Sequence, residues 1–182
     1  MALVLNGSGS ITGLSAGGLP DGSVTADDIA STLDLSGKTV TLPAGTGGKV
    51  LQVVNYIYSG EVSTTGDWID TGLTVTITPS SVSSKILVNV HQTGISNNSA
   101  NSGVKLRLMR NSTTLLQFEN GAAYQSGDND VGGSGITYLD SPATTSATTY
   151  KTQFGKGAGS SGTAKVGHYG VSSGITVMEI AA

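Results

Sequence analysis

The sequence predicts an all-β fold, in which an antiparallel jelly-roll or β-sandwich head follows an extended N-terminal arm with one short helix. Three observations predict it. Residues 1–48 are rich in Gly, Ser and Thr and contain no apolar run long enough to form a core. Residues 49–182 alternate apolar and polar residues over short segments, as half-buried strands do. Turn residues divide these segments every ~8–12 residues, which is typical of sandwiches and barrels.

The arm, residues 1–48, carries short apolar patches that cannot bury themselves. Thr25, followed three residues later by Asp28, matches a capping box and predicts a helix over 26–33. A helix of about eight residues is marginal in isolation, so it needs a surface to dock on. Residues 35–42 read as a strand, and 43–48 as a hinge. The residues expected to attach the chain to another structure are Leu3, Val4, Leu5, Ile11, Leu14, Ile29 and Leu33.

The head, residues 49–182, is expected to consist of about eight to eleven strands. In the segment 73–78, for example, Leu, Val and Ile occupy the odd positions and threonines the even ones, which predicts one buried and one exposed face. Polar loops are expected over 97–103, 121–135 and 155–162. The expected strands are 50–58, 73–78, 84–92, 104–109, 115–118, 136–139, 148–154, 164–169 and 175–180.

The composition excludes several classes of function. Charged residues make up 12% of the chain, about half the usual share, and the net charge is −3. Lys105 and Arg107 share one strand face, which is expected to be solvated rather than to bind nucleic acid. There is no Cys, hence neither a disulfide framework nor thiol catalysis. The first residues do not resemble a signal peptide, and no apolar run approaches the ~20 residues of a membrane span, so synthesis in the cytosol is expected without membrane insertion.

Residues that carry chemistry are sparse. His91 and His168 have no spacing typical of a zinc site. Asp128-Asn129-Asp130 lies in a Gly-rich stretch but lacks the bidentate Glu of a calcium loop, so ion binding is only a minor alternative to an exposed polar loop. Carboxylates are present, but the sequence does not designate a catalytic pair. We therefore expect no enzyme, no catalytic residue, no metal and no cofactor.

Two sets of sequence strings carry a resemblance to known proteins. The first set is 6–14 and 18–24, near the N-terminus, and the second, in the head, is 48–54, 77–81, 83–88, 140–142, 148–151 and 175–180. The first set resembles the N-terminal segment of virion appendage proteins of marine tailed phages, including cyanophages, and the second resembles the C-terminal domain of such fibre proteins. The resemblance implies a trimeric, jelly-roll head of the tumour-necrosis-factor-like kind on a particle-attached arm.

The resemblance implies a component of the virion. The expected function is a short trimeric fibre, on the tail or the head, which displays the β head for contact with a host-surface glycan or protein. The alternative is a capsid decoration or cement protein with a mechanical role. In both cases the arm contacts other virion proteins. An arm of 48 residues spans at most ~160 Å when extended, which suits a stub better than a long fibre.

Physical reasoning also favours an oligomer, because a charge-poor β protein must cover its sheet edges. Five aromatic residues are candidates either for a three-fold axis or for the core of each subunit: Tyr56, Tyr58, Tyr150, Phe154 and Tyr169.

The loops of the head are the candidates for host contact. Their Asn, Ser, Gly and Gln residues form adaptable hydrogen bonds, and a tyrosine there offers a stacking surface. The alternative is that these loops are solvated linkers. The candidate contact residues are Asn97, Asn98, Asn101, Tyr124, Gln125, Asp128 and Asn129.

Overall fold

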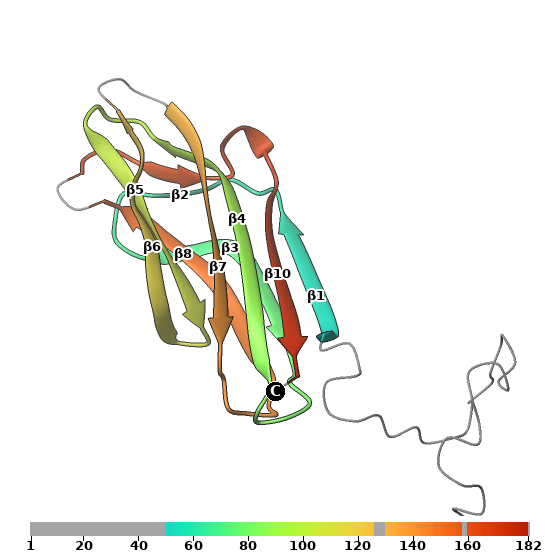
Figure 1. Cartoon of the computed structure of the whole chain (residues 1–182). Coiled ribbons are helices and arrows are strands. Elements are labelled where there is room, and N and C mark those ends of the chain that lie inside the picture. Colours follow the sequence, from blue (N-terminus) through green and yellow to red (C-terminus); the bar gives the residue numbers. More distant parts are fainter. Residues whose placement is uncertain (1–49, 126–129, 158–159, 182) are drawn as a thin grey trace, which may run out of the picture. The chain divides into compact units, whose positions relative to one another are not determined.

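The computed structural model describes residues 50–125, 130–157 and 160–181, and in these ranges strands form two antiparallel sheets packed face to face (Figure 1). The predicted helix over 26–33 and the predicted strand over 35–42 lie outside the described residues. The strands are β1 (Val50–Tyr58), β2 (Val62–Thr64), β3 (Ile69–Ile77), β4 (Lys85–Asn97), β5 (Ser102–Arg110), β6 (Thr113–Gln125), β7 (Asp130–Asp140), β8 (Thr148–Lys156), β9 (Ala164–Val166) and β10 (Ser173–Ile180).

The order of the strands is that of a jelly roll. The first sheet, called sheet A, has the order β1-β10-β4-β9-β2, and β7 pairs with the other side of β4. The second sheet, sheet B, has the order β3-β8-β5-β6. The chain crosses between the sheets six times: from β2 to β3, from β3 to β4, from β4 to β5, from β6 to β7, from β7 to β8 and from β8 to β9. This double wrapping confirms the predicted all-β, jelly-roll class.

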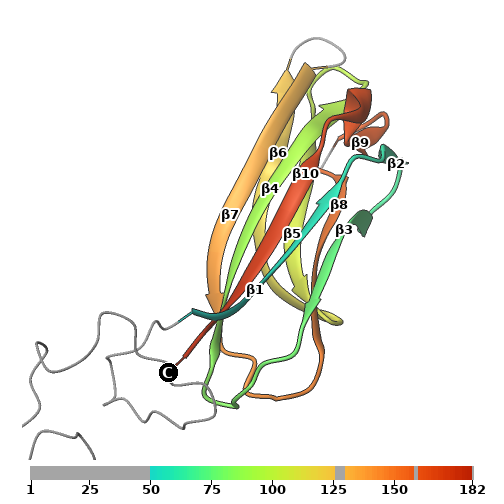
Figure 2. The ribbon, with the colours of Figure 1, turned by 90° about the vertical axis from the view of Figure 1, so that its right-hand side faces the viewer.

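The two ends of the sandwich differ in what they carry. Val50 pairs with Ile180, so the described chain begins and finishes at one end, here called the basal end. At the opposite, distal end lie residues 98–101, residues 160–163 and the turn over 167–170 (Figure 2). Val50, the first described residue, therefore lies at the end farthest from these loops.

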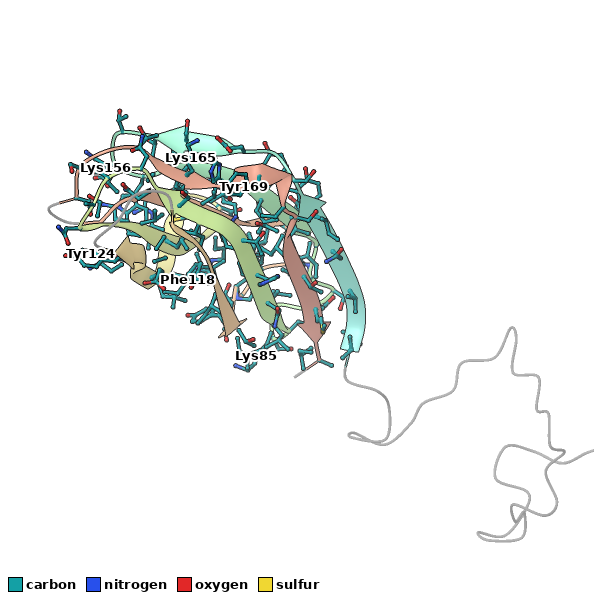
Figure 3. The ribbon with its side chains drawn as sticks, turned by 90° about the horizontal axis from the view of Figure 1, so that it is seen from above. Lys85, Phe118, Tyr124, Lys156, Lys165 and Tyr169 are labelled. Carbon is teal, nitrogen blue, oxygen red and sulfur yellow. The ribbon has the colours of Figure 1, made fainter. Side chains whose placement is uncertain are left out.

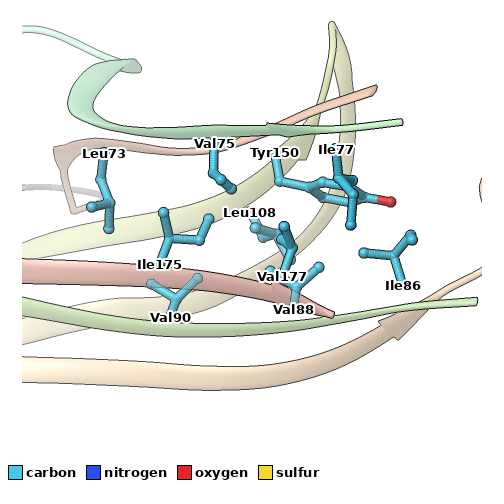
Figure 4. Close-up of a cluster of buried hydrophobic side chains, with 10 residues drawn as sticks. All are labelled: Leu73, Val75, Ile77, Ile86, Val88, Val90, Leu108, Tyr150, Ile175 and Val177. Atoms are coloured by element: carbon cyan, nitrogen blue, oxygen red, sulfur yellow. The ribbon is translucent and has the colours of Figure 1, made fainter. Parts of the chain in front are cut away.

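The alternation predicted for β3 is confirmed. Leu73, Val75 and Ile77 are buried between the sheets, whereas Thr74 and Thr76 face outward. The apolar core consists of two clusters. The basal cluster fills the space between β3, β8 and β5 on one side and β4 and β10 on the other, and is drawn in Figure 4. The distal cluster consists of Ile95, Val104, Leu106, Phe154, Ala164 and Val166.

A buried chain of polar side chains crosses between the sheets. Thr71 and Thr152 of sheet B are joined through their hydroxyls at 2.6 Å. The Thr152 hydroxyl donates to Gln92 Oε1 at 3.2 Å, and Gln92 Nε2 donates to Ser173 Oγ at 2.7 Å. All four residues are at most 2% exposed. Because each buried polar group finds its partner only in one alignment of the two sheets, this bridge favours that alignment over its neighbours.

The predicted loop over 121–135 is wrong, because β6 and β7 extend through most of it. The segment 132–135 pairs with β4, and a Cβ atom at Gly135 would lie 2.7 Å from the carbonyl oxygen of Val90. The glycine at 135 is therefore required because two strand backbones approach closely. The high glycine content of this stretch nevertheless resembles that of a loop, which explains the wrong prediction. The strand predicted over 164–169 stops at Val166, since a turn follows it.

Candidate functional surfaces

The distal loops over 98–101 and 160–163 pack on one another and are stabilised by their own side chains. Asn98 Oδ1 accepts a hydrogen bond from the Thr163 amide at 2.6 Å, and the hydroxyls of Ser99 and Ser161 lie 2.7 Å apart. Asn97 is only 2% exposed, and its Oδ1 accepts from the Ser99 amide. Contrary to expectation, Asn97 thus has no surface for a contact and instead shapes the loop.

Other expected contact residues remain at the surface or lie outside the description. Asn101 is exposed, with a φ of 54°, a left-handed conformation that Asn tolerates. Tyr124 of β6 is 60% exposed near the distal end, as Figure 3 shows from above. The backbone of Gln125 closes β6, whereas Asp128 and Asn129 lie outside the described residues.

A turn between β9 and β10 presents the most exposed large hydrophobic side chain of the described residues. This turn, His168–Gly170, displays Tyr169 with 74% of its surface exposed and a φ of 63°. A left-handed conformation is costly for a bulky residue. The sequence predicted Tyr169 at the end of a strand over 164–169, as a candidate either for a three-fold axis or for the core of its own subunit. The glycines on either side of the His-Tyr pair were the available signal for a turn.

The Tyr169 turn rests on a cluster of polar side chains. The ring of His168 stacks against the Tyr169 ring, with centroids 4.0 Å apart. Nδ1 of His168 lies 2.6 Å from Glu61 Oε2, and Lys165 Nζ lies 3.0 Å from Glu61 Oε1. The hydrogen bonds from His168 and Lys165 hold the pKa of the Glu61 carboxyl below its ordinary value. The carboxylate thus links the turn to the segment that follows β1.

The outward face of sheet A carries an apolar row that runs across four strands. The register aligns Val53 of β1 with Met178 of β10, Met178 with Leu87 of β4, and Leu87 with Leu139 of β7. Val53 is 56% exposed and Leu139 50% exposed, and the two residues between them are half-buried. A contiguous exposed apolar strip of this kind is typical of a surface that contacts another protein.

The next row on this face is polar but internally paired. Asn55 Nδ2 donates to Thr176 Oγ1 at 2.8 Å, and Asn89 Nδ2 donates to Thr137 Oγ1 at 2.9 Å. The third row contains Ile57 and His91 between glycines. None of the three rows contains Asp, Glu, Lys or Arg. Covering them would bury no formal charge and would leave few donors without a partner.

The outward face of sheet B has the opposite character, because its charges are already paired within the chain. Lys105 and Arg107 each lie 4.4 Å from the Trp68 ring, and Lys105 also pairs with Asp67. Lys151 Nζ lies 2.8 Å from Asp70. Lys105 and Arg107 thus share the outward strand face as expected, but they are less solvated than expected, because they pack over Trp68 and the Lys105 side chain is only 17% exposed. A charged, hydrated sheet face is a poor candidate for burial.

The aromatic residues considered for a three-fold axis divide into two groups. Tyr150 and Phe154 are fully buried, so they fill the core of their own subunit and are excluded from an interface. Tyr58 packs against the basal cluster. Only Tyr56 and Tyr169 have enough exposed surface to meet another chain.

The expected attachment residues of the arm remain a prediction, since all of them lie outside the described residues: Leu3, Val4, Leu5, Ile11, Leu14, Ile29 and Leu33. Within the described ranges, no group of three or more His, Cys, Asp or Glu residues is placed to hold a metal ion. No helix in those ranges has the length and apolar character needed to cross a membrane.

Comparisons with known proteins give distant structural matches. The sequence matches no protein-family model and no curated protein. Among solved structures, the VP2 subviral particle of infectious bursal disease virus is 11% identical with a TM-score of 0.43, and the match covers 79% of this chain and 37% of that one. The T=1 particles derived from the same virus give 13% identity and a TM-score of 0.40, with 91% and 44% covered. The chain spans about two fifths of the length of these proteins.

Proposed function

We propose that this chain is a structural protein of a virus particle, which attaches through its arm and displays a self-associating jelly-roll head. The observation that carries the proposal is the outward face of sheet A, with its apolar row from Val53 to Leu139 and with no Asp, Glu, Lys or Arg in that row or in the two rows distal to it. A head that stood alone would expose this strip to water. The sequence resemblance to phage appendage proteins supports the same setting, and it implies three copies in the assembly.

The arrangement of the ends supports display of the distal loops. The chain enters the described head at Val50, which pairs with Ile180 at the basal end. The loops over 98–101 and 160–163 lie at the distal end. A particle-bound arm would therefore leave the distal end toward solvent, where a host surface can meet it. We propose a short fibre as the primary function. Capsid decoration is the second candidate, favoured by the short arm of 48 residues.

Antibody-gold labelling of purified particles in the electron microscope tests this proposal. We expect gold on the particles, at the tail or at a few sites on the head for a fibre. Gold spread over the whole shell, with hundreds of copies per particle, would favour decoration and make the arm the functional part. Particles without any gold, while the protein is present in the lysate, would contradict the virion proposal.

A further inference from the structure

We propose that Tyr169 is a stacking platform for a pyranose sugar, with polar contacts supplied by the cluster around Glu61. This inference rests on the proposed contact with a host surface, and it names the class of ligand as carbohydrate. Its starting point is the combination of high exposure and backbone strain. Tyr169 keeps 74% of its surface exposed although its φ of 63° is unfavourable for a side chain of this size.

The turn that carries the exposed ring is held in place by several contacts, and the ring itself by His168. Below it, His168 stacks at 4.0 Å and is anchored by Glu61. The Gly167 amide donates to the Thr93 carbonyl at 3.0 Å. A Cβ atom at Gly94 would lie 2.4 Å from the His168 amide nitrogen, so β4 presses directly on the turn. Because the backbone under the ring is already fixed, little further ordering of the turn is needed on binding.

The glycines of the turn make this rigid position possible. Gly167 has a φ of 66°, and a Cβ atom there would lie 2.3 Å from the carbonyl oxygen of Gly60. Gly170, with a φ of 69°, lets the chain leave toward β10. Strain in the middle of such a turn does not arise from packing of the tyrosine ring in the core, since the ring is exposed. A strained, well-supported and exposed aromatic side chain points to a binding role.

The chemistry of the surroundings favours a sugar over another protein. An aromatic face carries negative partial charge and attracts the polarised C–H groups on one face of a pyranose ring. Glu61 pairs with both Lys165 and His168, and His168 stacks on Tyr169, so two hydrogen-bonding side chains are linked to the platform through His168. Such groups suit the hydroxyls at the rim of the sugar. In the view of Figure 3, Lys165 and Tyr169 lie on the same side of the head, whereas Tyr124 lies apart from them.

The test is binding of the labelled full-length chain to an array of immobilised hexoses, N-acetylhexosamines and their short oligomers. We expect the wild type to bind at least one of these sugars. Tyr169→Ala should weaken that binding at least tenfold, while Tyr169→Phe, which keeps the stacking face, should retain most of it. Lys165→Ala should reduce it several-fold. Tyr124→Ala is the matched control, since it removes another exposed distal tyrosine, and it should bind like the wild type.

Tyr169→Gly separates a binding role from a structural one. Glycine accepts the left-handed conformation without strain, so the denaturation midpoint should stay unchanged or rise while sugar binding is lost. A lower midpoint with unchanged binding would assign Tyr169 to folding and overturn the inference. So would a wild type that binds no sugar on the array, or a Tyr169→Ala variant that binds normally but loses its oligomeric mass. Gold on the particles would still support the structural proposal in each of these cases.

Discussion

Replacing Tyr150 with alanine is expected to lower the free energy of unfolding by about 4 kcal/mol. Among the described residues Tyr150 is the largest fully buried side chain, and it packs in the basal cluster beside Leu108 and Ile77 (Figure 4). Truncation of a buried aromatic residue leaves a cavity, and such changes typically cost 3–5 kcal/mol. Urea denaturation of the full-length chain at one fixed protein concentration, followed by the fluorescence of Trp68, measures the effect.

Tyr150→Phe divides this cost into packing and hydrogen bonding. The Tyr150 hydroxyl donates to Asp140 Oδ2 at 2.6 Å, and Arg110 Nη1 donates to both oxygens of the same carboxylate at 2.8 and 2.9 Å. Burial, together with the adjacent Asp140 carboxylate, raises the pKa of the Tyr150 hydroxyl, so it remains a donor. Phenylalanine keeps the ring and removes only the donor, so we expect a loss of about 1–2 kcal/mol. A Phe variant as unstable as the Ala variant would contradict the assignment of most of the cost to packing.

Acid should unfold the head largely by protonating Glu179. This carboxylate on β10 is fully buried, and Gln52 Nε2 donates to it at 2.6 Å while the amide and hydroxyl of Ser80 donate at 2.7 and 2.6 Å. Burial alone raises its pKa, but these hydrogen bonds outweigh burial and lower the pKa to about 2 from the ordinary 4.5. A lowered pKa contributes stability above pH 4.5, and this contribution is lost as the pH falls toward 2.

Glu179→Gln tests this directly. The amide presents a donor where the carboxylate accepted, so we expect a loss of about 2 kcal/mol at pH 7. Between pH 4.5 and 2 the variant should lose less stability than the wild type, and the two should converge near the acid limit. Urea denaturation midpoints of both proteins across this pH range measure the difference in stability. Glu61→Gln is the control. The ion pairs of Glu61 with Lys165 and His168 lie near the surface and should contribute at most about 1 kcal/mol to the free energy of unfolding. If the midpoints of the wild type and of Glu179→Gln fell in parallel with pH, the acid sensitivity could not be assigned to Glu179.

The strands with strict alternation could be predicted from the sequence, because their two faces meet different surroundings. Leu73, Val75 and Ile77 face the core and the threonines between them face water, and Val88 and Val90 of the predicted strand 84–92 are buried likewise. The stretch over 121–135 could not be assigned in this way. Its glycines are needed where backbones approach closely, and that need depends on the partner strand rather than on local pattern.

The candidate sites were harder to predict than the strands. Asn97 begins a stretch whose composition is typical of a contact loop, but β4 continues as far as this residue. Its side chain accepts a hydrogen bond from the Ser99 amide and so supports the loop over 98–101. The Tyr169 platform depends on Gly94 and Glu61, which are distant in sequence, so no local pattern indicates it. The apolar row of sheet A depends on register across four strands. Val53 and Leu139 are unremarkable as single residues and form a strip only when the strands are paired.

The central claim is that the head self-associates through the outward face of sheet A, and sedimentation equilibrium of the full-length chain tests it most directly. We predict a species of three times the 18.2 kDa chain mass at micromolar concentration. Leu139→Lys, which places a charge in the apolar row, should dissociate it into folded monomers, whereas Thr76→Lys on the outward face of sheet B should leave the mass unchanged. A monomeric wild type, or a Leu139→Lys variant with the mass of the wild type, would contradict the claim.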